Sequence, residues 1–86
     1  MPALSRFFGI IIKMYYIQKE HNPPHIHVIY GEETFSIAIK DGTILDGEMH
    51  PSPRALAMVK EWMDLHKEEL LKMWETQEFR EIEPLR

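Results

Sequence analysis

The sequence contains no cysteine among its 86 residues. This absence excludes disulfide bonds and thiolate metal sites, so any metal ion must be held by histidine and carboxylate groups. A chain without disulfide bonds is compatible with a reducing compartment, and we expect a cytoplasmic protein.

Long hydrophobic runs and an excess of basic residues are missing too. The longest apolar run, from Phe7 to Ile12, is far too short to span a bilayer, and no basic region precedes it as in a signal peptide. We therefore expect no membrane association. The chain has 10 Lys and Arg against 14 Asp and Glu, a net charge of −4. Such a charge disfavours non-specific nucleic-acid binding, which depends on basic side chains at phosphate groups.

The residues that are present suffice for a single domain spanning residues 1–86, with 44% hydrophobic content to form one core. Alternating and β-branched segments predict strands at about 7–17, 25–30, 33–40 and 43–47, and an amphipathic segment predicts a helix at about 53–77. We expect Gly9 to mark a bulge in the first strand. This order predicts an α+β fold, in which an antiparallel sheet of about four strands is covered on one face by one long C-terminal helix. The result would be a two-layer sandwich.

Two dipeptides, Gly31–Glu32 and Asp41–Gly42, are typical of two-residue hairpin loops. The first loop places the apolar residues of the second and third strands on one face, which we expect the helix to cover. The second loop places Ile39 opposite Ile44. By the same counting, His25 lies opposite Ala38 and His27 opposite Ser36, on the face away from the helix.

The predicted helix begins with a good start signal, Ser52 as N-cap and Pro53 as the first helical residue. His66 lies on its apolar stripe, so we expect a partly buried, hydrogen-bonded histidine on the covered side of the sheet. We expect His50 to be solvated. The stripe consists of Ala55, Leu56, Val59, Trp62, Met63, Leu70, Met73 and Trp74.

The main candidate for a functional site is the segment His21-Asn22-Pro23-Pro24-His25-Ile26-His27, which holds three of the five histidines. The two prolines restrict the backbone and favour an extended approach to His25. Residues two apart in a strand share a face, so His25 and His27 should lie side by side.

Three interpretations of these histidines remain open. In the first, His21, His25 and His27 bind a divalent metal, with zinc or nickel suited to imidazole ligands. In the second, His25 and His27 act as catalytic acid and base on RNA, while Lys13 and Tyr15 hold a phosphate and Ser36 lines the same face. In the third, His21 and His25 hydrogen-bond the loop backbone and organise the double-proline corner, so that their role is structural.

Nearly the whole chain resembles a small bacterial family catalogued as domain of unknown function four-one-six-zero. The resemblance rests on Ser5 to Ile10, Met14 to Tyr16, the His21 to His27 string, parts of the helix from Ala55 to Trp74, and the closing Ile82 to Leu85. It implies a bacterial protein that is often encoded beside another small protein in toxin–antitoxin-like pairs. It implies no activity and no catalytic residues.

The sequence does not decide whether the protein is an enzyme. One hypothesis is a component of a toxin–antitoxin-like pair with a functional histidine site, acting with the small protein of the adjacent gene and with RNA as a candidate target. The alternative is a non-catalytic protein-binding module, because the exposed edges of a small sheet can recruit a partner strand. Homo-oligomerisation stays open in both.

Overall fold

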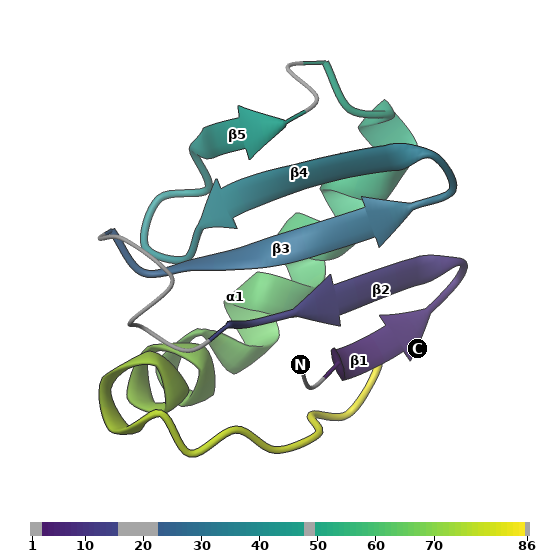
Figure 1. The fold of residues 1–86 in the computed structure, drawn as a ribbon. Helices are drawn as coiled ribbons and strands as arrows, with labels where there is room; N and C mark the ends of the chain where they lie inside the picture. The colour runs from purple at the N-terminus through teal and green to yellow at the C-terminus, as the bar shows by residue number, and fades with distance from the viewer. Residues whose placement is uncertain (1–2, 16–22, 48–49, 86) are drawn as a thin grey trace.

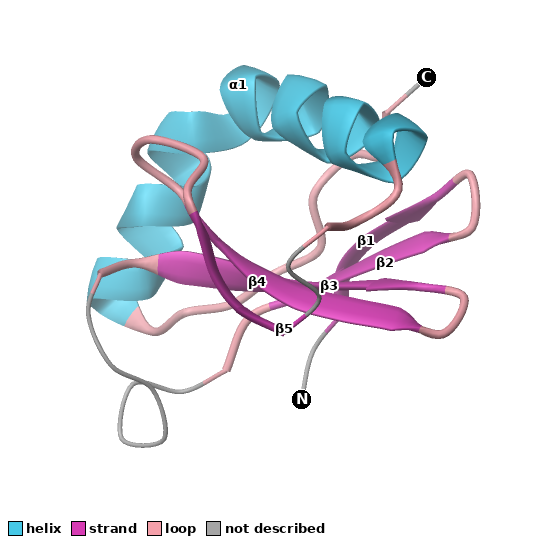
Figure 2. Ribbon diagram, turned by 90° about the horizontal axis from the view of Figure 1, so that it is seen from above, coloured by secondary structure: helices cyan, strands magenta, loops and turns pink. Residues whose placement is uncertain are grey.

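The computed structural model describes residues 3–15, 23–47 and 50–85. One antiparallel sheet has its five strands in sequence order, and a long helix crosses one of its faces (Figures 1 and 2). The α+β two-layer prediction is thus confirmed, with a fifth strand added. The elements are β1 (Ala3–Phe7), β2 (Ile10–Lys13), β3 (His25–Tyr30), β4 (Glu33–Ala38), β5 (Ile44–Gly47) and α1 (Pro53–Thr76).

The first predicted strand was wrong, because the chain turns back within it. β1 and β2 form a hairpin that pairs Phe7 with Ile10, and the turn residues Phe8 and Gly9 both have positive φ. Gly9 therefore lies in a tight turn and not in a bulge. The uninterrupted run of apolar residues conceals this turn, since Phe8 is an unusual residue at positive φ. Residues 16–17 of that predicted strand lie outside the described residues.

The predicted register of β3 and β4 is confirmed at every pair from Tyr30–Glu33 to His25–Ala38. Val28 lies opposite Phe35, and both are buried on the face toward α1. The alternation of apolar and polar residues and a two-residue loop agree here, which is why local reasoning succeeded.

The predicted register of the last strand was wrong. Ile44 pairs with Ile37 and not with Ile39, because β4 ends at Ala38 and the loop is longer than two residues. The Asp41 carboxylate accepts a hydrogen bond from Thr43 N–H at 3.0 Å, a side-chain turn that widens the loop. In addition, Ile39 N–H donates to Pro24 O at 3.0 Å, so this residue joins the double-proline corner instead of β5.

The helix begins at Pro53 as predicted and ends at Thr76, one residue earlier than expected. Ser52 occupies the N-cap position, but its side chain makes no capping hydrogen bond, and its N–H donates to the Glu33 carboxylate at 2.9 Å. No helix in the described ranges has the length and hydrophobicity that crossing a membrane requires. The largest fully buried side chains are those of Trp62, Phe35, Leu4, Ile10, Ile12, Met14, Ile26, Ile37, Leu70, Val28 and Val59.

α1 is bent at His66, whose backbone has non-helical dihedral angles (φ −123°, ψ 18°). The bend carries the second half of the helix around the end of the sheet (Figure 2). His66 is 17% exposed at its side chain and packs on Trp62, with ring centroids 5.2 Å apart. It is a partly buried and hydrogen-bonded residue, as expected from its place on the stripe.

Glu69 connects the bend to the C-terminal segment. Its carboxylate accepts a hydrogen bond from His66 Nδ1 at 3.1 Å and pairs with the guanidinium of Arg80. The hydrogen bond from His66, reinforced by Arg80, lowers the pKa of Glu69 below its usual value of 4.5, against the opposing effect of partial burial.

A carboxyl group with a lowered pKa adds stability above its unfolded-state pKa and loses it as the pH falls through its folded-state pKa. Because Glu69 is 39% exposed, we expect Glu69→Gln to cost only about 0.5 kcal/mol at neutral pH. The difference from the wild type should shrink as the pH falls below 4.5. Urea unfolding of both proteins across this range measures it, and a difference that does not change with pH would contradict the assignment.

Candidate functional site

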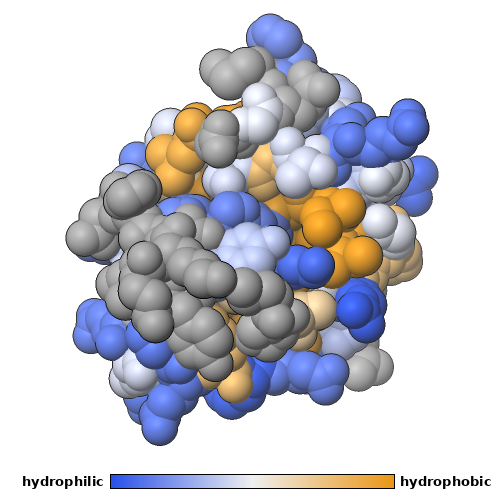
Figure 3. Space-filling view, viewed as in Figure 1, coloured by the Kyte–Doolittle hydropathy of each residue, from blue (hydrophilic) through white to orange (hydrophobic). Residues whose placement is uncertain are grey.

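His25 and His27 lie side by side on β3, on the face away from the first half of α1. Their Cα partners on β4 are Ala38 and Ser36, as predicted, and the two imidazole centroids are 5.1 Å apart. This face of the molecule mixes hydrophilic and hydrophobic residues in its described part (Figure 3). The small partners on β4 leave the imidazoles in contact with one another.

The backbone of the double-proline corner orients His25. Its Nδ1 lies 2.8 Å from Pro23 O, and a carbonyl oxygen only accepts hydrogen bonds, so Nδ1 carries a proton and donates. In a neutral ring the electron pair is then on Nε2. The prolines thus set both the approach to β3 and the tautomer of its first residue.

Trp74 covers His25, with ring centroids 5.0 Å apart, and His25 is only 7% exposed. The helical stripe predicted that Trp74 would pack on the opposite face of the sheet. The bend at His66 changes this, because the second half of α1 passes around the end of the sheet to reach β3. Sequence periodicity alone does not reveal such a bend.

His27 is held by a second set of contacts. Its Nδ1 lies 3.2 Å from the hydroxyl oxygen of Ser36, which is itself 5% exposed. The ring of Tyr15 packs edge-on against it at 4.4 Å, and Lys13 is its Cα partner on β2. The three candidates that the sequence placed on this face, Lys13, Tyr15 and Ser36, therefore surround the same imidazole.

The third histidine of the string, His21, lies outside the described residues. Within residues 3–15, 23–47 and 50–85, no three His, Asp or Glu side chains gather at a spacing that would hold a metal ion. His50 is exposed, and His66 is engaged with Glu69 on α1. The described part of the site is therefore a pair of oriented imidazoles.

His25 and His27 lie in a part of the chain that matches a known protein family. The profile described as Domain of unknown function (DUF4160) matches residues 9–75. The chain belongs to this family. No curated protein and no solved structure matches the chain significantly. The DUF4160 match confirms the family to which the sequence resemblance pointed, over residues 9–75.

The DUF4160 match includes the histidine pair, the double proline and Trp74. It does not extend to β1, which ends at Phe7, or to the segment after residue 75. The oriented imidazoles thus lie within the family's domain, whereas the hydrogen bond from Ile82 N–H to Leu4 O, which joins residues 77–85 to β1, lies outside the matched range.

Proposed function

We propose that His25 and His27 bind a divalent transition metal through Nε2, with His21 as a third ligand. The observation that carries this proposal is the hydrogen bond from His25 Nδ1 to Pro23 O at 2.8 Å. Histidines that ligate metals almost always donate their other ring N–H to a carbonyl, carboxylate or water, which fixes the tautomer and the ring orientation. Ser36 occupies the corresponding position at His27 Nδ1.

The donor set decides which ions suit this site. Three imidazoles without thiolates favour zinc or nickel, and a fourth position would be left for water. The rigid sheet and the double proline support the proposal, since little conformational freedom is lost when ligands on such a scaffold close on an ion. The negative net charge of the chain also favours a cation over a polyanion.

The biological setting in this proposal is a bacterial, cytoplasmic toxin–antitoxin-like pair, with the product of the adjacent gene as partner. Its support is the family resemblance, together with the absence of cysteine. In this setting the metal site would serve the function of the protein pair.

Calorimetric titration of chelator-treated protein with zinc and nickel tests the site. We expect one ion per chain, with an affinity that falls as the pH drops below about 6.5 because protons compete for imidazole. His25→Ala and His27→Ala should each lose binding, and His50→Ala, which removes an exposed histidine, should retain it. A wild type that binds no divalent ion, or a double variant that binds like the wild type, would contradict the proposal.

A second candidate, metal-independent RNA cleavage, is favoured by Lys13 and Tyr15 beside His27. One imidazole would take the proton of a ribose 2′-hydroxyl as it attacks the phosphorus, and the other would protonate the departing 5′-oxygen. Lys13 would neutralise the charge on the phosphoryl oxygens.

Cleavage of a ribo-oligonucleotide in excess chelator separates this candidate from the metal site. If it is right, His27→Ala lowers the rate by about 100-fold or more, and an all-deoxy substrate is not cut. Lys13→Arg should retain more activity than Lys13→Ala. If the purified protein leaves RNA intact with chelator present, acid–base cleavage is ruled out.

A further inference from the structure

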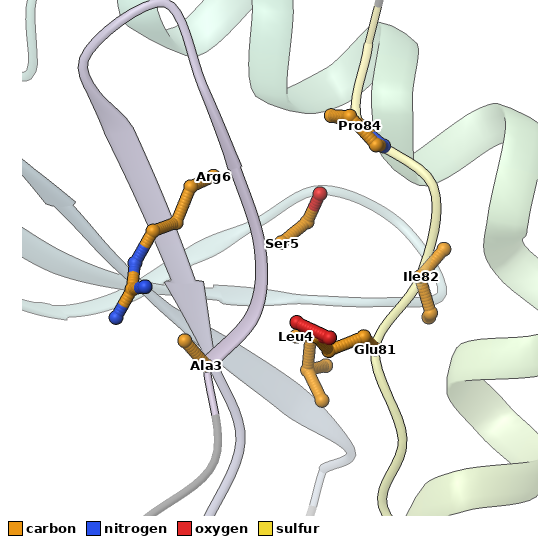
Figure 4. Close-up of a pocket in the computed structure, with 7 residues that line it drawn as sticks. All are labelled: Ala3, Leu4, Ser5, Arg6, Glu81, Ile82 and Pro84. Atoms are coloured by element: carbon orange, nitrogen blue, oxygen red, sulfur yellow. The ribbon is translucent and has the colours of Figure 1, made fainter.

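A wedge-shaped cavity of about 440 Å³ lies between β1 and the C-terminal segment, residues 77–85. The two segments run in the same direction, and the Ser5 side chain extends from β1 toward the C-terminal segment (Figure 4). The cavity is within the size range of ordinary binding pockets. Its lining consists of Ala3, Leu4, Ser5, Arg6, Glu81, Ile82 and Pro84.

Among the residues that the structure describes, a single backbone hydrogen bond joins the C-terminal segment to β1, and the wedge opens beyond it. Ile82 N–H donates to Leu4 O at 2.7 Å. One residue later, the carbonyl of Glu83 accepts a hydrogen bond from Trp62 Nε1 at 2.9 Å, which directs the chain toward α1. Pro84 then has no N–H to offer to the strand. Past Ile82, the edge of β1 therefore has no backbone partner within residues 83–85.

Ser5 places an unsatisfied polar group in this cavity. It is only 7% exposed, and its Oγ has no hydrogen-bond partner among the described residues. A buried polar atom in that state typically costs about 1–3 kcal/mol. A ligand that supplies a hydrogen-bonding group to Ser5 would recover this cost on binding.

The backbone of Arg6 adds a donor and an acceptor beside Ser5. In a two-residue hairpin the closing pair, here Phe7 and Ile10, exchanges both backbone hydrogen bonds. The residue before the closing pair then directs its N–H and C=O away from the partner strand, which for Arg6 means away from β2. Ser5 Oγ and these two backbone groups together match the hydrogen-bonding pattern of an extended peptide.

We propose that this wedge binds an extended, basic peptide segment of a partner protein, which adds alongside β1. The exposed Glu81 lines the C-terminal side of the wedge, against Arg6 on the strand side, and the exposed Glu83 lines the neighbouring hollow. Beyond Pro84 lies a second hollow of about 350 Å³, whose lining includes Glu61 and the 66%-exposed Leu65. The surroundings are therefore acidic with an apolar element, which suits a segment of alternating basic and apolar residues whose apolar residue lies opposite Arg6.

A second copy of this chain suits the edge less well. Antiparallel pairing of two β1 strands about Arg6, whose backbone groups lie at the open edge, would place two guanidinium groups directly opposite one another. Like charges in that position are destabilising. The proposal is also independent of the metal site, since it uses other strands and can fail by itself.

The test is an NMR titration of the isotope-labelled protein with an acetylated and amidated hexapeptide of alternating lysine and valine. We expect amide shifts in β1 and at residues 81–83. A matched glutamate–valine peptide should bind at least about tenfold more weakly. Ser5→Ala should stay folded, because it removes an unsatisfied hydroxyl, and should weaken binding about fivefold to tenfold.

Two further variants separate the backbone of β1 from its side chains. Arg6→Pro removes an N–H that β2 does not use and should abolish binding, whereas Arg6→Ala should retain it. If Arg6→Pro does not fold, Ser5→Leu, whose side chain fills the cavity, should abolish binding in its place. Absence of shifts, equal binding of both peptides, or undiminished binding by the blocking variant would overturn the proposal. A concentration-dependent dimer through β1 would assign the edge to a second copy and overturn it too.

Discussion

Saturating zinc should raise the melting temperature of the wild-type protein by about 10 °C or more. An ion present at one hundred times its dissociation constant stabilises the folded state by about 2.7 kcal/mol. In a domain of fewer than about 100 residues, each kcal/mol shifts the midpoint by about 4–8 °C. Differential scanning fluorimetry of chelator-treated protein, with and without zinc, measures the effect.

Each histidine variant must be compared with itself, with and without zinc, because His25 also packs on Trp74. His25→Ala should melt lower than the wild type without metal and should show little response to zinc. His27→Ala should lose the response as well, and the double variant should show none. His66→Ala should lose basal stability yet keep the metal response. A wild type whose melting temperature ignores every divalent ion tested would remove the metal proposal.

Gly47→Ala should cost about 3 kcal/mol or more, a large fraction of the stability of a small domain. Gly47 ends β5 with φ +94°, and a Cβ there would lie 2.2 Å from Thr34 O and 2.7 Å from Phe35 Cα. Both atoms belong to the backbone of β4, so the clash cannot be relieved by a side-chain rotation. The strained φ adds about 1–2 kcal/mol to the steric cost.

Gly31→Ala is the matched control for this substitution. Gly31 also has a positive φ, +60°, but nothing lies within 4 Å of its added Cβ. It should therefore cost only the conformational strain, about 1 kcal/mol. Urea unfolding of the two variants separates strain from collision, and equal losses would mean that β5 can move away from β4.

The histidine pair shows how far local reasoning extends. Alternation along β3 and the loop after Tyr30 were enough to predict that His25 and His27 share one face of the sheet, opposite Ala38 and Ser36. The structural interpretation anticipated that His25 hydrogen-bonds the loop backbone, but it did not name the Pro23 carbonyl as the partner. That contact depends on the backbone path through the double proline, which residue types restrict but do not define.

The predictions that were wrong concern segments in which the local sequence signal was weak or was outweighed by contacts with other residues. Phe8 has no strong preference for a turn, so the hairpin between β1 and β2 was read as one strand. The Asp41–Gly42 signal was real, but the Asp41 side chain and the bond from Ile39 to Pro24 O lengthened the loop and shifted β5. These contacts join residues from different parts of the chain, and no dipeptide rule includes them.

The sequence by itself determined the α+β class, the central hairpin of β3 and β4, and the helix start at Pro53. These features depend on periodicity, on turn residues and on the proline at the first helical position, whose effects are complete within a few neighbouring residues. Tertiary structure decided the bend at His66, the position of Trp74 over His25, and the wedge beside β1. Trp74 and His25 come from distant segments, and the wedge follows from the hydrogen bond between Ile82 and Leu4, so these two outcomes depend on the assembled fold.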